Sequence, residues 1–310
     1  MGIAREILLK ASQNEWLGRQ FQRHSFSRRA ARRFMPGEDA ASALAAAQEL
    51  QHAGIVSLVT LLGENVTTLS EAQAVTARYT ELLSDIHSGS LDCQLSVKPT
   101  QLGIDLPGRV CLDQLLSLAE QAKSHNSRVW VDMESSGYVE RTLHLAETVH
   151  ARHANVGVCV QAYLYRTMRD IERLAQSGIA VRLVKGAYKE APSVALQKKP
   201  QVDGAYLDLA KSLLDTAAIT GNVFPAFGTH DMKLIRSIQD YAAEKQLSAD
   251  SYEFEMLFGI RRDSQSMLVA EGARVRVLIS YGSSWFPWYM RRLAERPANV
   301  WFVVRSLMSR

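Results

Sequence analysis

Two cations in one short segment stand out as groups able to do chemistry. Arg182 lies among apolar and β-branched neighbours, where a cation is costly to bury without a partner. Lys185 follows three residues later, and Gly186 has no Cβ to keep a ligand away from the backbone. These features predict a site for an anion such as a pyrophosphate, or for an electron-rich ring. The alternative is a structural ion pair with Asp132 or Glu134.

A second group of charges lies between Pro287 and Pro297, which are well placed to start and to end a helix. Helical positions i, i+3, i+4 and i+7 share one stripe, and here they are Trp288, Arg291, Arg292 and Glu295. Arginine binds carboxylates bidentately, and a carboxylate can hold a cationic nitrogen, so the stripe predicts a zwitterion site. The alternative, a solvated helix with its own salt bridge, would leave Trp285, Trp288 and Tyr289 exposed.

Short β-branched runs that alternate with amphipathic stretches must position these groups, and such alternation indicates parallel βαβ units. The predicted strands are Ile55–Leu61, Gln94–Lys98, Arg128–Asp132, Val156–Gln161, Ala180–Val184, Val223–Phe227, Tyr252–Met256 and Arg274–Ile279. The predicted helices include Leu112–Ser124, Val139–Ala151, Met168–Gln176, Ala205–Thr216, Lys233–Lys245 and Ser264–Glu271. Eight strands predict an α/β protein with a distorted, TIM-like (βα)8 barrel and extra N-terminal helices. A doubly wound nucleotide-binding fold is the alternative, but no G-x-G-x-x-G turn follows the first run.

The chain is predicted to have three parts: a helical arm (1–45), a catalytic barrel (46–300) and an amphipathic tail (301–310). Residues 1–37 hold eight basic and two acidic residues, although the net charge of the chain is only +4. Such an arm could contact anionic lipid, nucleic acid or a protein, but we favour a solvated arm. The tail could lie on a membrane surface, but we favour docking on the protein itself or on another subunit.

The sequence shows no pattern typical of a disulfide-rich protein, a membrane span, a signal peptide or a metal site. Cys93, Cys111 and Cys159 form no C-x-x-C pair, which fits a reducing cytoplasm. No apolar run reaches the roughly 18 residues of a membrane span, and no signal peptide is evident. We therefore expect a cytoplasmic protein, with peripheral contact at the inner face of the plasma membrane as a further option. No metal site is predicted, and the helical residues His144, His150 and His153 are interpreted as exposed.

Catalytic groups of a (βα)8 barrel come from the C-terminal ends of its strands. Here each predicted strand closes on polar groups, which are Glu64, Lys98, Asp132 with Glu134, Gln161, Arg182 with Lys185, His230 with Asp231, Glu255 and Tyr281. One polar strand end is common, and His230 alone could be a simple hydrogen-bonding residue. Eight such ends at one rim predict an active site.

At these residues the chain resembles the proline dehydrogenase family over about residues 54–300. The matching segments are LLGE (Leu61–Glu64), VKPTQLG (Val97–Gly103), VDME (Val131–Glu134), QAYLYRT (Gln161–Thr167), RLVKGAYKE (Arg182–Glu190), GTHD (Gly228–Asp231), FEMLFGIR (Phe254–Arg261) and YGSSWFPWYMRRLAERPAN (Tyr281–Asn299). The resemblance implies non-covalent FAD and oxidation of L-proline to Δ1-pyrroline-5-carboxylate. Hydride would pass from proline C5 to flavin N5, and the electrons would pass on to a membrane quinone. Because the chain ends at Arg310, a separate pyrroline-5-carboxylate dehydrogenase is the expected consumer of the product.

The resemblance also implies roles for individual residues. The catalytic positions are Asp132, Arg182 and Tyr281, with Arg182 near the flavin N5. The substrate-binding positions are Lys98, Leu183, Tyr188, Tyr289, Arg291, Arg292 and Glu295. The cofactor-binding positions are Met133, Gln161, Lys185, Gly186, Ala187, Thr229, His230, Glu255 and Met256. In a closed barrel the first strand neighbours the eighth, so we further predict an ion-pair gate between Glu64 and Arg291.

Two other functions remain open from the residues. A Schiff-base aldolase would use Lys98 or Lys185 as its nucleophile at a strand end. A protein that binds membrane surfaces or nucleic acid would use the basic arm, but it would give no reason for polar strand ends. We therefore expect no nucleic-acid partner.

Overall fold

Eight parallel strands close into one barrel in the computed structural model, which describes the backbone of residues 31–295 and the side chains of residues 31–290. The strands are β1 (Val56–Leu61), β2 (Cys93–Val97), β3 (Val129–Val131), β4 (Val156–Gln161), β5 (Ala180–Val184), β6 (Pro225–Gly228), β7 (Glu253–Leu257) and β8 (Val275–Tyr281). Each strand pairs with the next, and β1 pairs in parallel with β8 to close the ring. The predicted (βα)8 barrel is confirmed.

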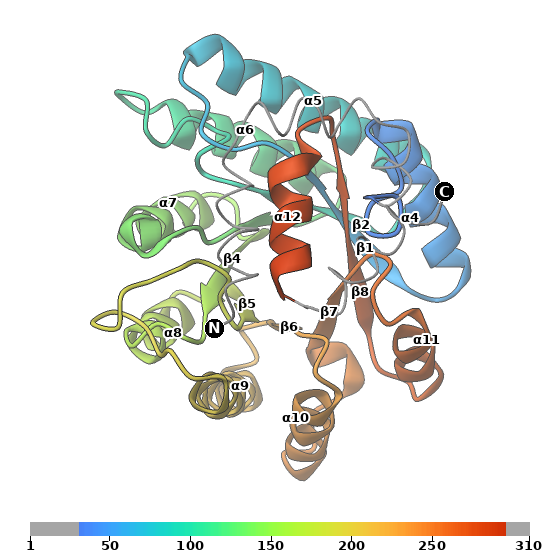
Figure 1. Ribbon diagram of the computed structural model, residues 1–310, viewed down its shortest axis with the longest axis vertical. Coiled ribbons are helices and arrows are strands. Elements are labelled where there is room, and N and C mark those ends of the chain that lie inside the picture. The colour runs from blue at the N-terminus through green and yellow to red at the C-terminus, as the bar shows by residue number, and fades with distance from the viewer. Residues whose placement is uncertain (1–30, 296–310) are drawn as a thin grey trace, which may run out of the picture.

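Helices surround the strands (Figure 1). They are α4 (Ala40–His52), α5 (Leu69–Ser88), α6 (Val110–Ser124), α7 (Val139–His150), α8 (Thr167–Gln176), α9 (Lys199–Thr220), α10 (Met232–Glu244), α11 (Arg262–Ala270) and α12 (Trp285–Glu295). Two 3-10 helices, η1 (Ser136–Tyr138) and η2 (Ala249–Ser251), lie in the connections. Helix α4 packs against β1 and β8. Of the predicted helical arm, residues 1–30 lie outside the described residues, as does the tail 301–310.

Helix α5 was not among the predicted helices, although a sequence motif marks its first residues. The Thr68 hydroxyl accepts a hydrogen bond from Glu71 N, and the Glu71 carboxylate accepts one from Thr68 N. This reciprocal capping box satisfies two backbone donors that a helix start would otherwise leave unpaired. Its T-x-x-E spacing therefore marked a helix start that the analysis of apolar patterns missed.

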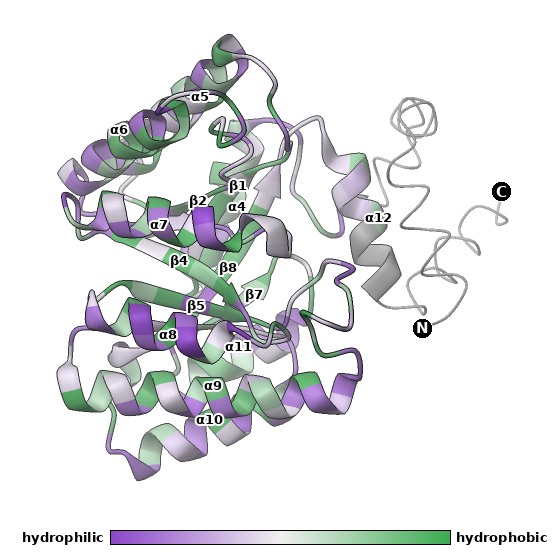
Figure 2. Cartoon of the chain, turned by 90° about the vertical axis from the view of Figure 1, so that its left-hand side faces the viewer, coloured by the Kyte–Doolittle hydropathy of each residue, from purple (hydrophilic) through white to green (hydrophobic). Residues whose placement is uncertain are grey.

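Helix α12 begins two residues before the predicted start at Pro287. The first four N–H groups of a helix have no partner within it, so proline at the third position costs no hydrogen bond. Figures 1 and 2 show α12 across one end of the barrel, the end at which β8 leads into it. The helix therefore covers the rim to which the predicted polar residues belong.

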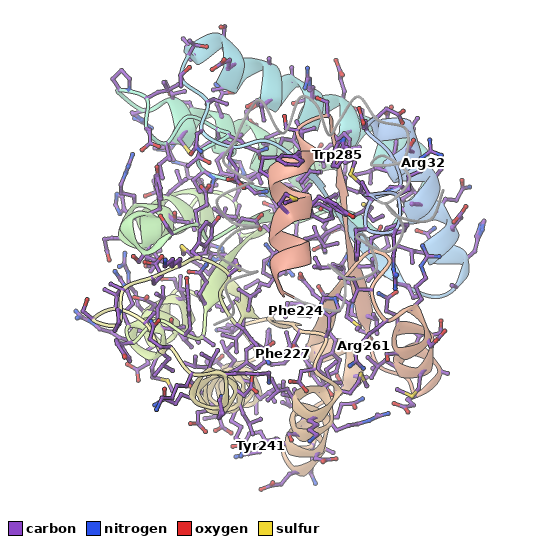
Figure 3. The ribbon with its side chains drawn as sticks, in the orientation of Figure 1. Arg32, Phe224, Phe227, Tyr241, Arg261 and Trp285 are labelled. Atoms are coloured by element: carbon purple, nitrogen blue, oxygen red, sulfur yellow. The ribbon has the colours of Figure 1, made fainter. Side chains whose placement is uncertain are left out.

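The rings of α12 are buried, against the expectation for a solvated helix. Trp285 and Tyr289 are each 1% exposed, and they pack with Phe34, Met35 and Leu62. The Trp285 indole, at the start of α12 (Figure 3), donates a hydrogen bond to Glu38 Oε1 at 3.0 Å. Aromatic packing thus ties α12 to the segment that precedes α4.

No helix among the described residues is long and apolar enough to cross a membrane.

Candidate active site

The centre of the rim is the guanidinium of Arg182 on β5, only 4% exposed. Its Nη1 lies 3.2 Å from Glu255 Oε2 on β7. Its Nη2 donates to Asp132, which directly follows β3, and to the Ser96 hydroxyl on β2 at 3.0 Å. Four different strands therefore converge on one cation, which makes its position depend on closure of the whole barrel.

Asp132 is the carboxylate that links this cation to a second one. Ser96 Oγ donates to Asp132 Oδ1 at 2.7 Å, and Lys98 Nζ lies 3.6 Å from Asp132 Oδ2. Burial alone would raise the pKa of Asp132, but the charges of Arg182 and Lys98 outweigh it and hold the pKa below its ordinary value. Asp132 is therefore an anion that orients two cations at the rim.

Glu255 is a carboxylate in the opposite situation. Burial raises its pKa above the ordinary glutamate value, and the charge of Arg182 only partly opposes this effect. Its Oε2 contacts Arg182, but its Oε1 is buried without a hydrogen-bond partner among the described residues. The same holds for Gln161 Oε1 at the end of β4. Buried polar atoms are rarely left unpaired, so these two oxygens are candidate acceptors for a donor of a bound molecule.

Lys185 has carboxylate partners of its own. Its Nζ lies 2.5 Å from Asp203 Oδ1 on α9 and 3.3 Å from Asp231 Oδ2, which caps α10. The two cations of this segment therefore point to different partners, because Arg182 binds Asp132 and Glu255. Asp132 and Glu134 were the ion-pair partners considered from the sequence, whereas Asp203 and Asp231 were not predicted as partners of Lys185.

Gly186 adopts φ +107°, a conformation that other residues rarely take. A Cβ at this position would lie 2.3 Å from the ring of Tyr163. Glycine is therefore required here by both backbone conformation and space. It allows the chain to turn sharply beside Lys185 at the rim.

His230 follows β6 and accepts a hydrogen bond from Leu257 N through its Nε2 at 2.9 Å. A neutral imidazole that accepts through Nε2 carries its proton on Nδ1. Thr229, the preceding residue, donates its backbone N–H to the carbonyl of Glu255 at 3.1 Å. The β6 and β7 ends are thereby held together next to Arg182.

Glu134 has a positioning role that was not predicted. It is buried, and its carboxylate accepts hydrogen bonds from Thr100 N at 3.1 Å and Thr100 Oγ1 at 2.7 Å. Burial raises its pKa, although the Thr100 hydrogen bonds oppose this effect. Glu134 thus fixes the turn that follows Lys98.

The remaining residues that were predicted to bind substrate or cofactor differ in how exposed they are. Leu183, Met133, Met256, Tyr281 and Tyr289 are buried, Tyr188 is half-buried and Ala187 is exposed. Burial raises the pKa of Tyr281 and of Tyr289, each to about 12, so both phenols are neutral at physiological pH. The side chains of Arg291, Arg292 and Glu295 lie outside the described residues, so the predicted clamp and the Glu64–Arg291 gate stay predictions.

Ser96 is a further site residue that was not predicted from the sequence. Its hydroxyl lies between Arg182 Nη2 and Asp132 Oδ1. Its only signal is a small polar residue between Leu95 and Val97 in β2.

We expect Ser96→Ala to lower turnover about 10-fold or more while the protein stays folded. Loss of one hydrogen bond to charged groups corresponds to about 1.5–3 kcal/mol, and here it loosens the guanidinium–carboxylate geometry. Steady-state kinetics and the melting temperature measure the two effects. Ser84→Ala, on the exposed surface of α5, is the matched control. Wild-type turnover in Ser96→Ala would show that Asp132 and Arg182 need no such link.

The chain matches the family model described as "Proline dehydrogenase" over residues 43–305. It is 35% identical to proline dehydrogenase 1 of Bacillus subtilis (strain 168), over 99% of this chain and 100% of that protein. It is 34% identical to a proline dehydrogenase of Deinococcus radiodurans, over 90% of both chains. The crystal structure of proline utilization A (PutA) from Bdellovibrio bacteriovorus shares the fold, with a TM-score of 0.81 at 21% identity. That match covers 94% of this chain, which spans only 38% of the length of the PutA chain. The chain thus belongs to the proline dehydrogenase family.

Proposed function

We propose that this chain oxidises L-proline to Δ1-pyrroline-5-carboxylate with FAD as the hydride acceptor. The observation that carries the proposal is the buried Arg182 guanidinium, which Asp132 and Glu255 hold at the C-terminal rim of the barrel. Catalytic groups of (βα)8 enzymes lie at this rim. Membership of the family supplies the reaction, and the charge cluster supplies a place for it.

The residues present fit FAD. Gln161 Oε1 and Glu255 Oε1, which have no partner among the described residues, are acceptors for donors of a bound molecule, and the half-buried Lys185 adds a cation. The missing Cβ of Gly186 makes room for the Tyr163 ring rather than for a ligand. The residues that would hold the cofactor are Asp132, Met133, Gln161, Arg182, Lys185, Gly186, Ala187, Thr229, His230, Glu255 and Met256. When bound, FAD accepts the hydride that proline loses. Nearby cations favour the negative charge that a reduced flavin carries, so Arg182 would assist this step.

Charged side chains are proposed to bind the polar groups of proline, and apolar and aromatic side chains are proposed to enclose its ring. Lys98, Arg291 and Arg292 would hold the proline carboxylate, and Glu295 would hold its nitrogen. Leu183, Tyr188, Tyr281 and Tyr289 would enclose the ring. A secondary ammonium has no free lone pair, so the nitrogen must be deprotonated before hydride leaves C5. Placing C5 at a near-attack distance is then the main task of these side chains.

The Glu64–Arg291 pair is proposed as a reversible closure over bound proline. A guanidinium–carboxylate contact is strong, yet it can open without breaking the fold. We expect Glu64→Gln to raise the KM for proline by several-fold without a change in melting temperature. Thr67→Ala, in the exposed loop that follows, is the control. Unchanged kinetics would show that any such pair is a surface bridge, worth about 0–1 kcal/mol.

The proposed partners are a membrane quinone, which would reoxidise the flavin, and a separate pyrroline-5-carboxylate dehydrogenase. A cytoplasmic location with peripheral contact at the membrane would suit both. The Schiff-base aldolase has less support, because Lys98 and Lys185 each contact carboxylates and the family is that of proline dehydrogenases.

The cofactor proposal is tested by releasing the bound molecule from the purified protein with denaturant. We expect FAD, identified by mass, at about one molecule per chain. Protein that contains no flavin, and that gains no proline-oxidising activity when FAD is added, would contradict the proposal.

A further inference from the structure

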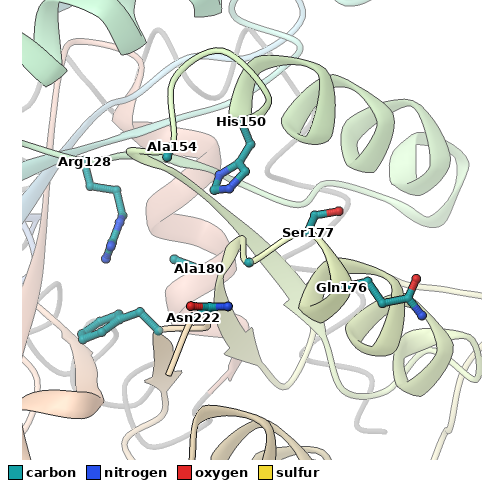
Figure 4. A pocket seen from close by; sticks show the side chains of 9 residues that line it. Arg128, His150, Ala154, Gln176, Ser177, Ala180 and Asn222 are labelled. Atoms are coloured by element: carbon teal, nitrogen blue, oxygen red, sulfur yellow. The ribbon is translucent and has the colours of Figure 1, made fainter. Parts of the chain in front are cut away.

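A pocket with a volume of about 410 Å³ opens at the other end of the barrel, where the strands begin (Figure 4). Its lining comes from the starts of β3 and β5, the turn before β6 and the C-terminal ends of α7 and α8. The lining residues that matter below are Arg128, His150, Gln176, Ser177, Asn222 and Phe224. A pocket of this volume can hold a small molecule.

Among the described residues that line this pocket, Arg128 is the one charged side chain. Its guanidinium carbon lies 5.0 Å from the ring centroid of Phe224 and 5.4 Å from that of Trp130. Among the described residues it forms no ion pair or hydrogen bond, and its Nε is buried without an acceptor. Rings can attract a cation, but they do not accept the five N–H bonds that a guanidinium offers.

The neighbouring carboxylates are already used. Glu253, whose charge favours the cationic form of Arg128, binds Arg276 Nε at 2.7 Å and Arg274 Nε at 3.1 Å. Asp92 lies within 3.5 Å of both of these arginines. Glu255, whose charge also favours the cationic form of Arg128, contacts Arg182 instead. Among the described residues, Arg128, Arg274 and Arg276 therefore share Glu253 and Asp92, and one positive charge at this end of the barrel has no paired carboxylate.

This excess positive charge is unfavourable unless an anion binds beside it. Burial lowers the pKa of Arg128, which means that its surroundings disfavour the cation. The start of the strands in a (βα)8 barrel ordinarily serves stability. A half-buried guanidinium with a buried Nε that has no acceptor among the described residues does not contribute to it. A bound monoanion would balance the charge, whereas a dianion would reverse the imbalance.

The rest of the lining points to a second feature of the ligand. His150 is the last residue of α7 and Gln176 the last of α8, so helix C-termini with partial negative charge surround the pocket. Such an end repels an anion but favours a hydrogen-bond donor. His150 is half-buried rather than exposed as predicted, and its Nδ1 lies 3.3 Å from the carbonyl of Val156, so its Nε2 is the nitrogen left for a ligand.

We propose that this pocket binds a small monocarboxylate that also carries a hydrogen-bond donor, such as a hydroxy or amino acid. The carboxylate pairs with Arg128, and the donor faces the helix C-termini around His150 and Ser177. The site lies at the opposite end of the barrel from Asp132 and Lys98. The ring of Trp130 connects the two ends, because the Arg182 guanidinium carbon also lies 5.4 Å from its centroid.

The test compares ligand-induced shifts in melting temperature for the holoenzyme and its variants, with glycolate as the probe. Because glycolate can also enter the substrate site, the informative quantity is the difference between wild type and Arg128→Gln. We expect the wild type and the control Arg236→Gln, whose side chain pairs with Glu271 on the surface, to shift equally. In Arg128→Gln, the part of the melting-temperature shift that comes from glycolate in this pocket should disappear, because the affinity of the pocket for glycolate should fall about 10- to 100-fold.

Three further measurements make the outcome decisive. Ser177→Trp, a substitution on the exposed rim, should block the pocket without removing a charge, and it serves if Arg128→Gln does not fold. Neutral glycolamide should produce no shift through this pocket. A crystal soaked with glycolate should show the carboxylate on Arg128. Identical glycolate shifts in the wild type, Arg128→Gln and Ser177→Trp would overturn the proposal, and a larger Arg128-dependent shift with inorganic phosphate would overturn the choice of a monocarboxylate.

Discussion

Arg182→Ala is expected to abolish measurable proline oxidation and to destabilise the fold by about 3–5 kcal/mol. Its removal leaves two buried carboxylates, Asp132 and Glu255, without the cation that both contact. At Glu255, loss of that opposing charge would raise the pKa further and favour the protonated acid. The change therefore affects the charge of the site as well as its geometry.

Urea unfolding at two pH values separates the effects of this substitution. Because the pKa of Asp132 is held below its ordinary value by Arg182 and Lys98, its ion pairs stabilise the wild type above the ordinary aspartate pKa. This stabilisation is lost as the pH falls through the lowered pKa, so the variant and the wild type should converge in acid. Arg236→Ala, on the surface of α10, is the control and should change neither activity nor pH dependence. An active Arg182→Ala protein would remove this cluster from the catalytic account.

Lys98→Met is expected to raise the KM for L-proline by tens to thousands of fold while the bound flavin remains. Lys98 is largely buried beside Asp132 at the end of β2, so its charge faces the site rather than bulk water. Truncating one partner of a buried charge pair costs about 2–5 kcal/mol, and each 1.4 kcal/mol is a factor of ten in affinity. Steady-state kinetics with L-proline and prolinamide, which lacks the carboxylate, measures the loss.

The preference for proline over prolinamide should shrink in Lys98→Met, because the lost interaction is with the carboxylate. Lys199→Met removes a mostly exposed lysine and should leave this preference intact. An unchanged preference in Lys98→Met, together with a raised KM, would show that Lys98 acts through Asp132 rather than on the substrate.

Strands such as β1, β4 and β5 were predictable because they are largely buried on both faces and therefore appear as short runs rich in apolar, β-branched residues. The bounds of β4 and β5 agree with the sequence prediction, and polar residues follow each strand as expected. The partners of the cations were not predictable to the same degree. Asp203 and Asp231 lie 18 and 46 positions from Lys185, and the packing of α9 and the pairing of β5 with β6 bring them to it.

Ser96 illustrates the same difficulty on a smaller scale. A serine in an apolar strand is common, and its contact with Arg182, 86 positions away, depends on the register of four strands. His150 is a further example, since its helical spacing suggested an exposed face but its ring packs towards the start of β4. Periodicity thus predicted the elements, whereas long-range side-chain contacts required the three-dimensional structure.

The proposed transfer of a hydride from proline to a bound flavin can be observed in an anaerobic titration. The absorbance spectrum of the purified protein would be recorded as L-proline is added without any electron acceptor. We expect the oxidised flavin bands to bleach to completion in the wild type, and prolinamide to bleach them far less. A flavin spectrum that excess L-proline leaves unchanged would contradict the account.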